Sequence, residues 1–285
     1  ENEWTALVDI QPNGSNPPFF CVHGATGDIL WFRELARHLG PDQPFYGLQS
    51  IGLDGVREPL TSVEEMARHY LAEVRVLQPD GPYHLGGYCF GGNIAYEMAQ
   101  QLQAEGQAVA FLAMLSSEPY TTGFNDVGSR LGYLKGLANN LPHWLSALRE
   151  MEGHEVSART QRKARRFWRE RIRQVDHLRA NDVIEHGEEL PPHRQRIIEL
   201  NSKALANYRF KPYHGHIHVY QPQAPSLLAV DVPGLGWQHL ASSGITLKLI
   251  PGSHQSIFKE PRVRYFAEQL GAALAEVYGE EIKMS

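Results

Sequence analysis

Short continuous apolar runs alternate with longer amphipathic stretches along most of this chain. The runs are bounded by turn-forming residues, which is typical of strands buried on both faces. The amphipathic stretches repeat their apolar residues at helical spacing. The predicted strands cover 4–10, 19–22, 45–49, 83–85, 109–115, 215–220 and 245–250, and the predicted helices cover 30–39, 62–77, 94–102 and 263–274. Strands that alternate with helices predict an α/β fold, whose ligands bind at the carboxyl ends of the strands.

The pattern changes between about residues 120 and 212. No strand-like run occurs there, and helical periodicity dominates. The stretches with that periodicity are 129–141, 143–151, 159–179 and 193–208. We therefore predict a single domain over 1–285, with a helical lid at about 120–212 inserted between two core strands.

Charge and cysteine content narrow the class of protein. The formal net charge is -5, whereas a nucleic-acid binder begins with a basic footprint. With only Cys21 and Cys89 present, no disulfide framework is expected and a bridge between the two is disfavoured, which fits a reducing compartment. No apolar run reaches membrane-spanning length, and no basic-then-apolar leader begins the chain. We expect a cytoplasmic protein without nucleic-acid or membrane partners, or a domain of a longer one.

The stretch 85–92 reads Leu-Gly-Gly-Tyr-Cys-Phe-Gly-Gly. It matches the strand-to-helix turn Gly-x-nucleophile-x-Gly, with cysteine where serine is usual. In such a turn, a Cβ at Gly87 or Gly91 would collide with the neighbouring strand or helix. The helix N-terminus would favour both a thiolate and the oxyanion of an attacked carbonyl. We interpret Cys89 as a nucleophile; the alternative is a glycine-rich turn around a small buried cysteine.

Two further loops complete the candidate site. The small-residue loop 23–28 follows a buried strand, where hydrolases of this architecture place an oxyanion donor. We predict an oxyanion hole formed by the backbone N–H groups of Ala25 and Phe90; a turn without chemistry is the alternative. His254 lies in the loop 251–256, between the last strand and the closing helix. That place matches the nucleophile–acid–histidine order of α/β-hydrolases and makes His254 the candidate general base.

Two other clusters of residues are candidate binding sites. His216 and His218 share one face of a strand, but no further ligand spacing accompanies them, so we predict structural histidines and no metal site. One predicted lid helix is strongly basic, and it is either a solvated face or a docking surface for an acidic partner or a phosphate-bearing arm. Its candidate docking residues are Arg162, Arg165, Arg166 and Arg169.

The segments 20–24, 87–93, Gly236-Trp237 and 251–254 together resemble the signature segments of the thioesterase domains that end nonribosomal peptide and polyketide synthases. The resemblance extends over about 18–274. It implies an α/β-hydrolase fold with a mostly parallel sheet, flanking helices and a helical lid. It also implies an acyl or peptidyl carrier protein as partner, whose phosphopantetheine arm delivers the chain to the nucleophile. Release would give an acid, or a macrocyclic lactone or lactam, with no resident cofactor.

The sequence departs from that family at two positions. With Cys89 in place of serine, the intermediate would be a thioester, which stays activated toward amines; an engineered serine replacement would give the same sequence. The family's usual aspartate position is Ser116, which cannot compensate an imidazolium charge. We prefer Glu118 as the acid that orients His254. Asp231, or a Cys–His pair without an acid, is the alternative.

Two rival functions follow from these departures. A free-standing cysteine hydrolase of small esters or lactones, similar to dienelactone hydrolases, is disfavoured by the long predicted lid. An inactive hydrolase fold that serves as a carrier-binding module is favoured by the missing aspartate.

Overall fold

A seven-stranded sheet forms the centre of the computed structural model, which describes residues 4–119, 190–224 and 233–284. The strands are β1 (Leu7–Gln11), β2 (Phe19–Val22), β3 (Phe45–Leu48), β4 (Tyr83–Tyr88), β5 (Val109–Leu115), β6 (Ile217–Ala224) and β7 (Ile245–Ser253). Their spatial order is β1-β3-β2-β4-β5-β6-β7. Only the pairing of β1 with β3 is antiparallel, and β1 is an edge strand. The predicted mostly parallel sheet is confirmed.

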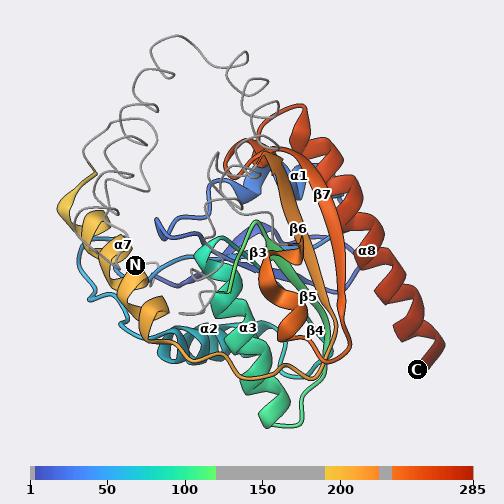
Figure 1. The fold of residues 1–285 in the computed structure, drawn as a ribbon, viewed down its shortest axis with the longest axis horizontal. Helices are drawn as coiled ribbons and strands as arrows, with labels where there is room; N and C mark the ends of the chain where they lie inside the picture. The colour runs from blue at the N-terminus through green and yellow to red at the C-terminus, as the bar shows by residue number, and fades with distance from the viewer. Residues whose placement is uncertain (1–3, 120–189, 225–232, 285) are drawn as a thin grey trace, which may run out of the picture.

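Helices cover both faces of this sheet. They are α1 (Phe32–Leu39), α2 (Val63–Leu77), α3 (Phe90–Ala104), α7 (Pro192–Asn207) and α8 (Arg262–Met284), with 3-10 segments η2 (Pro233–His239) and η3 (Ser256–Phe258). Figure 1 shows α8 running beside β7, while α2 and α3 lie together on the other side with α7 next to them. Across the described ranges, no helix combines the length and apolar character that crossing a membrane requires.

The strand β2 illustrates why the central strands are apolar at every position. Its side chains alternate between the two faces of the sheet. Phe20 and Val22 pack into the core under α2 and α3, whereas Phe19 and Cys21 pack into the core under α1 and α8. All four residues are buried. In a strand that is covered on both faces, no alternate position can be polar. This explains the continuous apolar run in the sequence.

Some predicted boundaries differ from the structure. β4 continues to Tyr88 and β7 to Ser253, beyond the predicted ends at 85 and 250. The hydrophobic pattern did not reveal the end of β4, because glycines have no side chains that could show it. In the structure, Gly86 and Gly87 pair with β2 and β5. The prediction that Leu30 is an apolar helix residue is wrong. It precedes α1 and is 77% exposed.

The described part of the predicted lid includes α7, which confirms the helix predicted over 193–208. Residues 120–189 lie outside the described residues, and with them the three other predicted lid helices and the four candidate docking arginines. The lid itself therefore stays a prediction. α7 packs against α2 and α3, close to the carboxyl end of β2.

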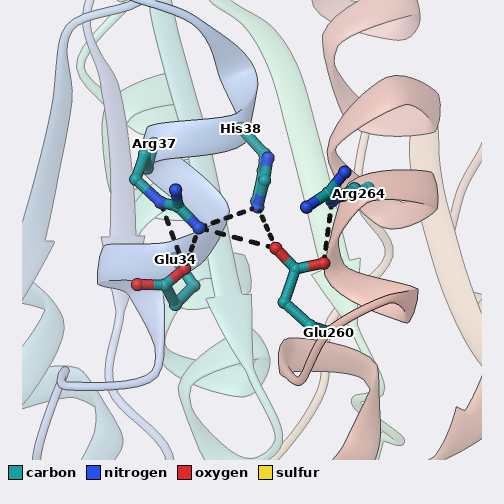
Figure 2. A network of polar contacts seen from close by, with 5 residues as sticks. All are labelled: Glu34, Arg37, His38, Glu260 and Arg264. Atoms are coloured by element: carbon teal, nitrogen blue, oxygen red, sulfur yellow. Dashed lines mark hydrogen bonds and ion pairs between the residues drawn. The ribbon is translucent and has the colours of Figure 1, made fainter.

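A polar network joins α1 to the start of α8, as Figure 2 shows. The two carboxylate oxygens of Glu260 contact His38 Nε2 at 2.8 Å and Arg264 Nε at 2.9 Å, and Arg37 bonds Glu34. The Arg264 hydrogen bond, with help from His38, lowers the pKa of the Glu260 carboxyl. Among the described residues, Glu34, His38 and Glu260 form the one group with metal-ligand spacing. Because arginines already bind these carboxylates, we interpret the group as an ion-pair network.

The turn from β4 into α3 depends on close backbone packing. A Cβ on Gly87 would lie 2.1 Å from the carbonyl oxygen of Gly91, and a Cβ on Gly91 would lie 2.1 Å from that of His23. Both obstacles are backbone atoms, which cannot move aside as a flexible side chain could. The predicted reason for these two glycines is confirmed.

We expect Gly91→Ala to lower the free energy of unfolding by about 3 kcal/mol, because the first turn of α3 must move away from β2. The matched control is Gly279→Ala in α8, where an added Cβ would meet no atom within 4 Å. There we expect a gain of about 0.5–1 kcal/mol, since alanine suits a helix interior better than glycine. Urea titrations of both variants measure the difference. Equal stabilities would contradict the packing argument.

Candidate active site

Cys89 occupies the tip of the turn between β4 and α3. Its backbone has φ 55° and ψ -120°, a conformation that a residue with a side chain adopts only under strain. The turn is held from β5, because the Cys89 N–H donates to the carbonyl of Leu115 at 3.0 Å. The predicted strand–turn–helix placement of Cys89 is confirmed. Its role as a nucleophile stays a prediction.

Two backbone N–H groups meet at the Cys89 sulfur. They belong to Phe90, the first residue of α3, and to Ala25, in the loop after β2, and both lie close enough to the thiol to lower its pKa. The structure therefore brings together the three groups that the sequence predicts for the nucleophile and the oxyanion hole. An oxyanion on a carbon bonded to this sulfur would form close to both donors.

Burial controls the ionisation of this thiol. It raises the pKa of Cys89 to about 11, although the hydrogen bonds from Phe90 and Ala25 lower it, and the charge of Glu118 raises it further. The expected direction of the N–H groups is confirmed, because both lower the pKa of the thiol, but desolvation outweighs them in the resting protein. The thiol is protonated near neutral pH, so it could act as a nucleophile only if a base took its proton.

The buried ring of His23 holds the loop that carries Ala25. Its Nδ1 lies 2.6 Å from the carbonyl oxygen of Gly24, and its Nε2 lies 2.8 Å from the hydroxyl of Tyr70 in α2. Since a carbonyl only accepts, Nδ1 carries the hydrogen and Nε2 accepts from Tyr70. Burial lowers the pKa of His23 to about 4, so the ring stays neutral. Sequence reasoning listed His23 within the loop but missed this positioning role.

His254 follows β7 directly and lies beside the end of β5. Its Nδ1 is 2.6 Å from the Oγ of Ser116, the residue after β5. Ser116 has a positive φ of 50°, and its N–H donates to the carbonyl of Tyr220 in β6 at 2.8 Å. Cys89, Ser116 and His254 therefore occupy the carboxyl ends of β4, β5 and β7, the edge of the sheet where the strand order predicts a site.

Tyr88 connects the nucleophile turn to the histidine, and sequence reasoning missed it. Its ring stacks on the imidazole of His254 with centroids 4.8 Å apart, and its hydroxyl donates to the His254 carbonyl at 3.0 Å. Because Tyr88 directly precedes Cys89, one short backbone segment places both side chains. An aromatic residue next to the nucleophile is a signal that could have indicated this contact.

The residue that contacts Nδ1 of His254 is Ser116, whereas Glu118 is the acid that the sequence favours for this role. A neutral hydroxyl cannot compensate an imidazolium charge as a carboxylate would. Glu118 is exposed, yet desolvation by the surrounding residues raises the pKa of its carboxyl and the nearby His254 lowers it in part, so the two groups interact electrostatically. Asp231, the alternative, lies outside the described residues. The orienting role of Glu118 stays a prediction.

Gly236-Trp237 supports the end of β5. The side chain of Trp237 is fully buried, and its Nε1 donates to the carbonyl of Ser117 at 2.7 Å. This bond holds the backbone next to Ser116. In the sequence, Gly236-Trp237 is a weak signal, because the carbonyl that Trp237 binds lies 120 residues earlier in the chain.

The remaining candidates lie apart from this edge. His216 uses both ring nitrogens, with Nδ1 3.0 Å from the Ser243 carbonyl and Nε2 2.8 Å from the Thr246 hydroxyl. It would lose these contacts by binding a metal, which favours the structural interpretation. Cys21 is a free, buried thiol whose pKa is raised by burial.

A strained residue between strand and helix, two N–H groups at its side chain and a histidine after the last strand define an α/β-hydrolase. The family model described as "Thioesterase domain" matches residues 17–274, and the chain belongs to this family.

Similar proteins agree with that assignment. Malpibaldin synthetase from Mortierella alpina is 42% identical over 117 residues, which are 41% of this chain and 2% of that protein. Chondramide synthase cmdD from Chondromyces crocatus is 25% identical over 281 residues, covering 95% of this chain and 7% of that protein. A structure of the NocB thioesterase domain in covalent complex with a fluorophosphonate nocardicin G analog has a TM-score of 0.63 at 23% identity, covering 95% of this chain and 100% of that one, which supports the fold. The chain spans a small part of these curated relatives.

The raised pKa predicts slow alkylation of Cys89 at neutral pH. We expect its rate with iodoacetamide to rise about tenfold per pH unit between pH 7 and 9.5, because only the thiolate reacts and the thiol pKa is about 11. Mass spectrometry of the Cys89 peptide follows the reaction, and Cys89→Ala gives the background. A plateau below pH 8 would contradict the burial argument.

Proposed function

We propose that this chain is the releasing thioesterase domain of a nonribosomal peptide or polyketide synthase, with Cys89 as the residue that carries the acyl or peptidyl chain. The single observation that supports this most is that the N–H groups of Phe90 and Ala25 both lie close enough to the Cys89 thiol, at the strained turn between β4 and α3, to lower its pKa. Such donors serve an acyl-transfer reaction, in which an oxyanion forms next to the nucleophile. The similar synthases are much longer than this chain, which supports a role as one domain among several.

In the proposed acylation step, His254 Nε2 takes the proton of the Cys89 thiol while the sulfur attacks the thioester carbonyl of the carrier arm. The other ring nitrogen, Nδ1, keeps its hydrogen throughout and donates a hydrogen bond to Ser116 Oγ, 2.6 Å away. The oxyanion bonds the N–H groups of Phe90 and Ala25. The intermediate collapses by breaking the bond to the carrier sulfur, which receives the proton from His254. One thioester is exchanged for another, so the step is close to level in energy.

In the proposed release step, His254 takes a proton from a second nucleophile, which attacks the Cys89 thioester and frees the thiol. That nucleophile is water in hydrolysis, or an internal hydroxyl or amine in macrocyclisation. Ser116 accepts a hydrogen bond without charge, so it stabilises an imidazolium less than a carboxylate would. An internal nucleophile held next to the acyl carbon depends less on a strong base than water does. Cys89 and Ser116 together therefore favour ring closure over hydrolysis.

The substrate is expected to arrive on the phosphopantetheine arm of an acyl or peptidyl carrier protein. The site residues lie at the carboxyl edge of the sheet, and residue 119, the last one described before the predicted lid, follows β5 at that edge. The docking residues remain Arg162, Arg165, Arg166 and Arg169, as predicted from the sequence.

Intact-mass measurement after mixing with an acyl-thioester mimic of the carrier arm tests the nucleophile. We expect one acyl adduct on the wild type and none on Cys89→Ala, because the thiol is the acyl acceptor. Cys21→Ala is the matched control, since that cysteine is fully buried in β2, out of reach of a thioester in solution, and should leave the adduct unchanged. An adduct that persists in Cys89→Ala would rule out the proposed nucleophile.

Ser116 is tested by its effect on the base. Ser116→Ala removes the Nδ1 partner of His254, and we expect the rate of thioester turnover to fall about tenfold, the worth of one hydrogen bond. We expect Ser116→Asp to raise hydrolysis and to shift the acidic, rising limb of the rate–pH profile to higher pH, because a carboxylate stabilises the imidazolium, which must lose its proton before His254 can act as a base.

The adjacent Ser117→Ala is the control for these variants. Its hydroxyl is buried without a hydrogen-bond partner, so turnover should stay within about twofold of the wild type. A Ser116→Ala variant as active as Ser117→Ala would show that Ser116 does not orient the histidine.

A further inference from the structure

Asn201 lies in α7, 176 residues from Ala25 in the chain, yet its Nδ2 donates to the carbonyl of Ala25 at 3.1 Å. We propose that Asn201 is a positioning residue for the oxyanion site, which holds the Ala25 segment so that its N–H faces the Cys89 sulfur. This inference rests on the proposed function, because it assigns Ala25 as a donor to the transition state.

The loop has two anchors, one on each side of Ala25. His23 binds the carbonyl of Gly24, which belongs to the same peptide group as the Ala25 N–H. In a trans peptide the C=O and N–H point in opposite directions, so this anchor aims the N–H away from His23. Asn201 binds the carbonyl of the next peptide group. Fixing both peptide planes removes the rotation about Ala25 that would turn its N–H from the sulfur.

The α7 helix docks along the whole loop. Arg194 lies 3.9 Å from the carboxylate of Asp28, and the Ile197 side chain packs beside Gly27. Asn201 is the buried polar member of this face. A buried carbonyl needs a donor, and Asn201 supplies one from an element that the sequence separates widely from the loop.

The hydrogen bonding of Asn201 is incomplete. The side chain is 1% exposed, and its Oδ1 has no hydrogen-bond partner. Leaving a buried acceptor unpaired destabilises the fold, so structural packing alone would be better served by an apolar side chain. The polar residue is explained if its Nδ2–H is needed at Ala25.

Two reactions of Cys89 distinguish a positioning role of Asn201 from a purely structural one. Acylation by a thioester forms an oxyanion, whereas alkylation by iodoacetamide displaces iodide at a saturated carbon and forms none. We expect Asn201→Leu to lower the limiting acylation rate at saturating thioester about tenfold or more, with half-saturation unchanged. The alkylation rate at pH 8 should fall by a smaller factor than the acylation rate, because the Ala25 N–H only partly offsets the effect of burial on the resting thiol but faces the full charge of the oxyanion.

The matched control is Asn207→Leu, the same change at an exposed position of the same helix, which should alter neither rate. If Asn201→Leu fails to fold, as judged by thermal unfolding, Asn201→Ala is measured in its place. Wild-type acylation in the Asn201 variant, or an equal loss of both reactions, would overturn the inference. A wild type that forms no adduct on Cys89 would instead overturn the proposed function, so the two failures are distinguishable.

Discussion

The contact between the first turn of α3 and the end of β2 is the constraint on which the rest of the site depends. Gly91 approaches the carbonyls of Val22 and His23 so closely that no side chain fits between them. This approach brings the helix N-terminus, which carries the Phe90 N–H, against the loop that carries the Ala25 N–H. Cys89 then occupies a strained conformation between them. The approach of the two predicted oxyanion donors toward each other is therefore a consequence of backbone packing, and the side chains of His23 and Asn201 then hold the Ala25 segment.

The site that results is largely uncharged. Burial keeps the Cys89 thiol protonated and His23 neutral, and a serine hydroxyl contacts His254 where a carboxylate is usual in this family. Such a site stabilises charge mainly through fixed N–H dipoles, which act strongly where water is excluded. It suits a reaction whose ground states are neutral thioesters and whose charge appears only in the transition state. Glu118 is the nearby charged group, and it disfavours a resting thiolate.

The neutral site is held from several distant elements. Trp237 fixes the backbone beside Ser116, Tyr88 fixes His254, and α7 reaches the Ala25 loop. Each of these contacts joins segments far apart in the sequence, and each acts on a backbone carbonyl. The ends of the strands place the site residues, and these long-range hydrogen bonds limit the movement of the backbone that carries them.

Local patterns in the sequence determined the order of strands and helices, the nucleophile turn and the two glycines in it. They also indicated Ala25 and Phe90, because hydrophobic periodicity and steric fit act over a few residues and can be read without a fold. Only the tertiary structure decided that Ser116 meets His254, that burial keeps Cys89 protonated, and that Leu30 is exposed. These three features depend on which side chains approach one another across the sheet and on how much water they exclude. Neither can be read from the residues next to them in the chain.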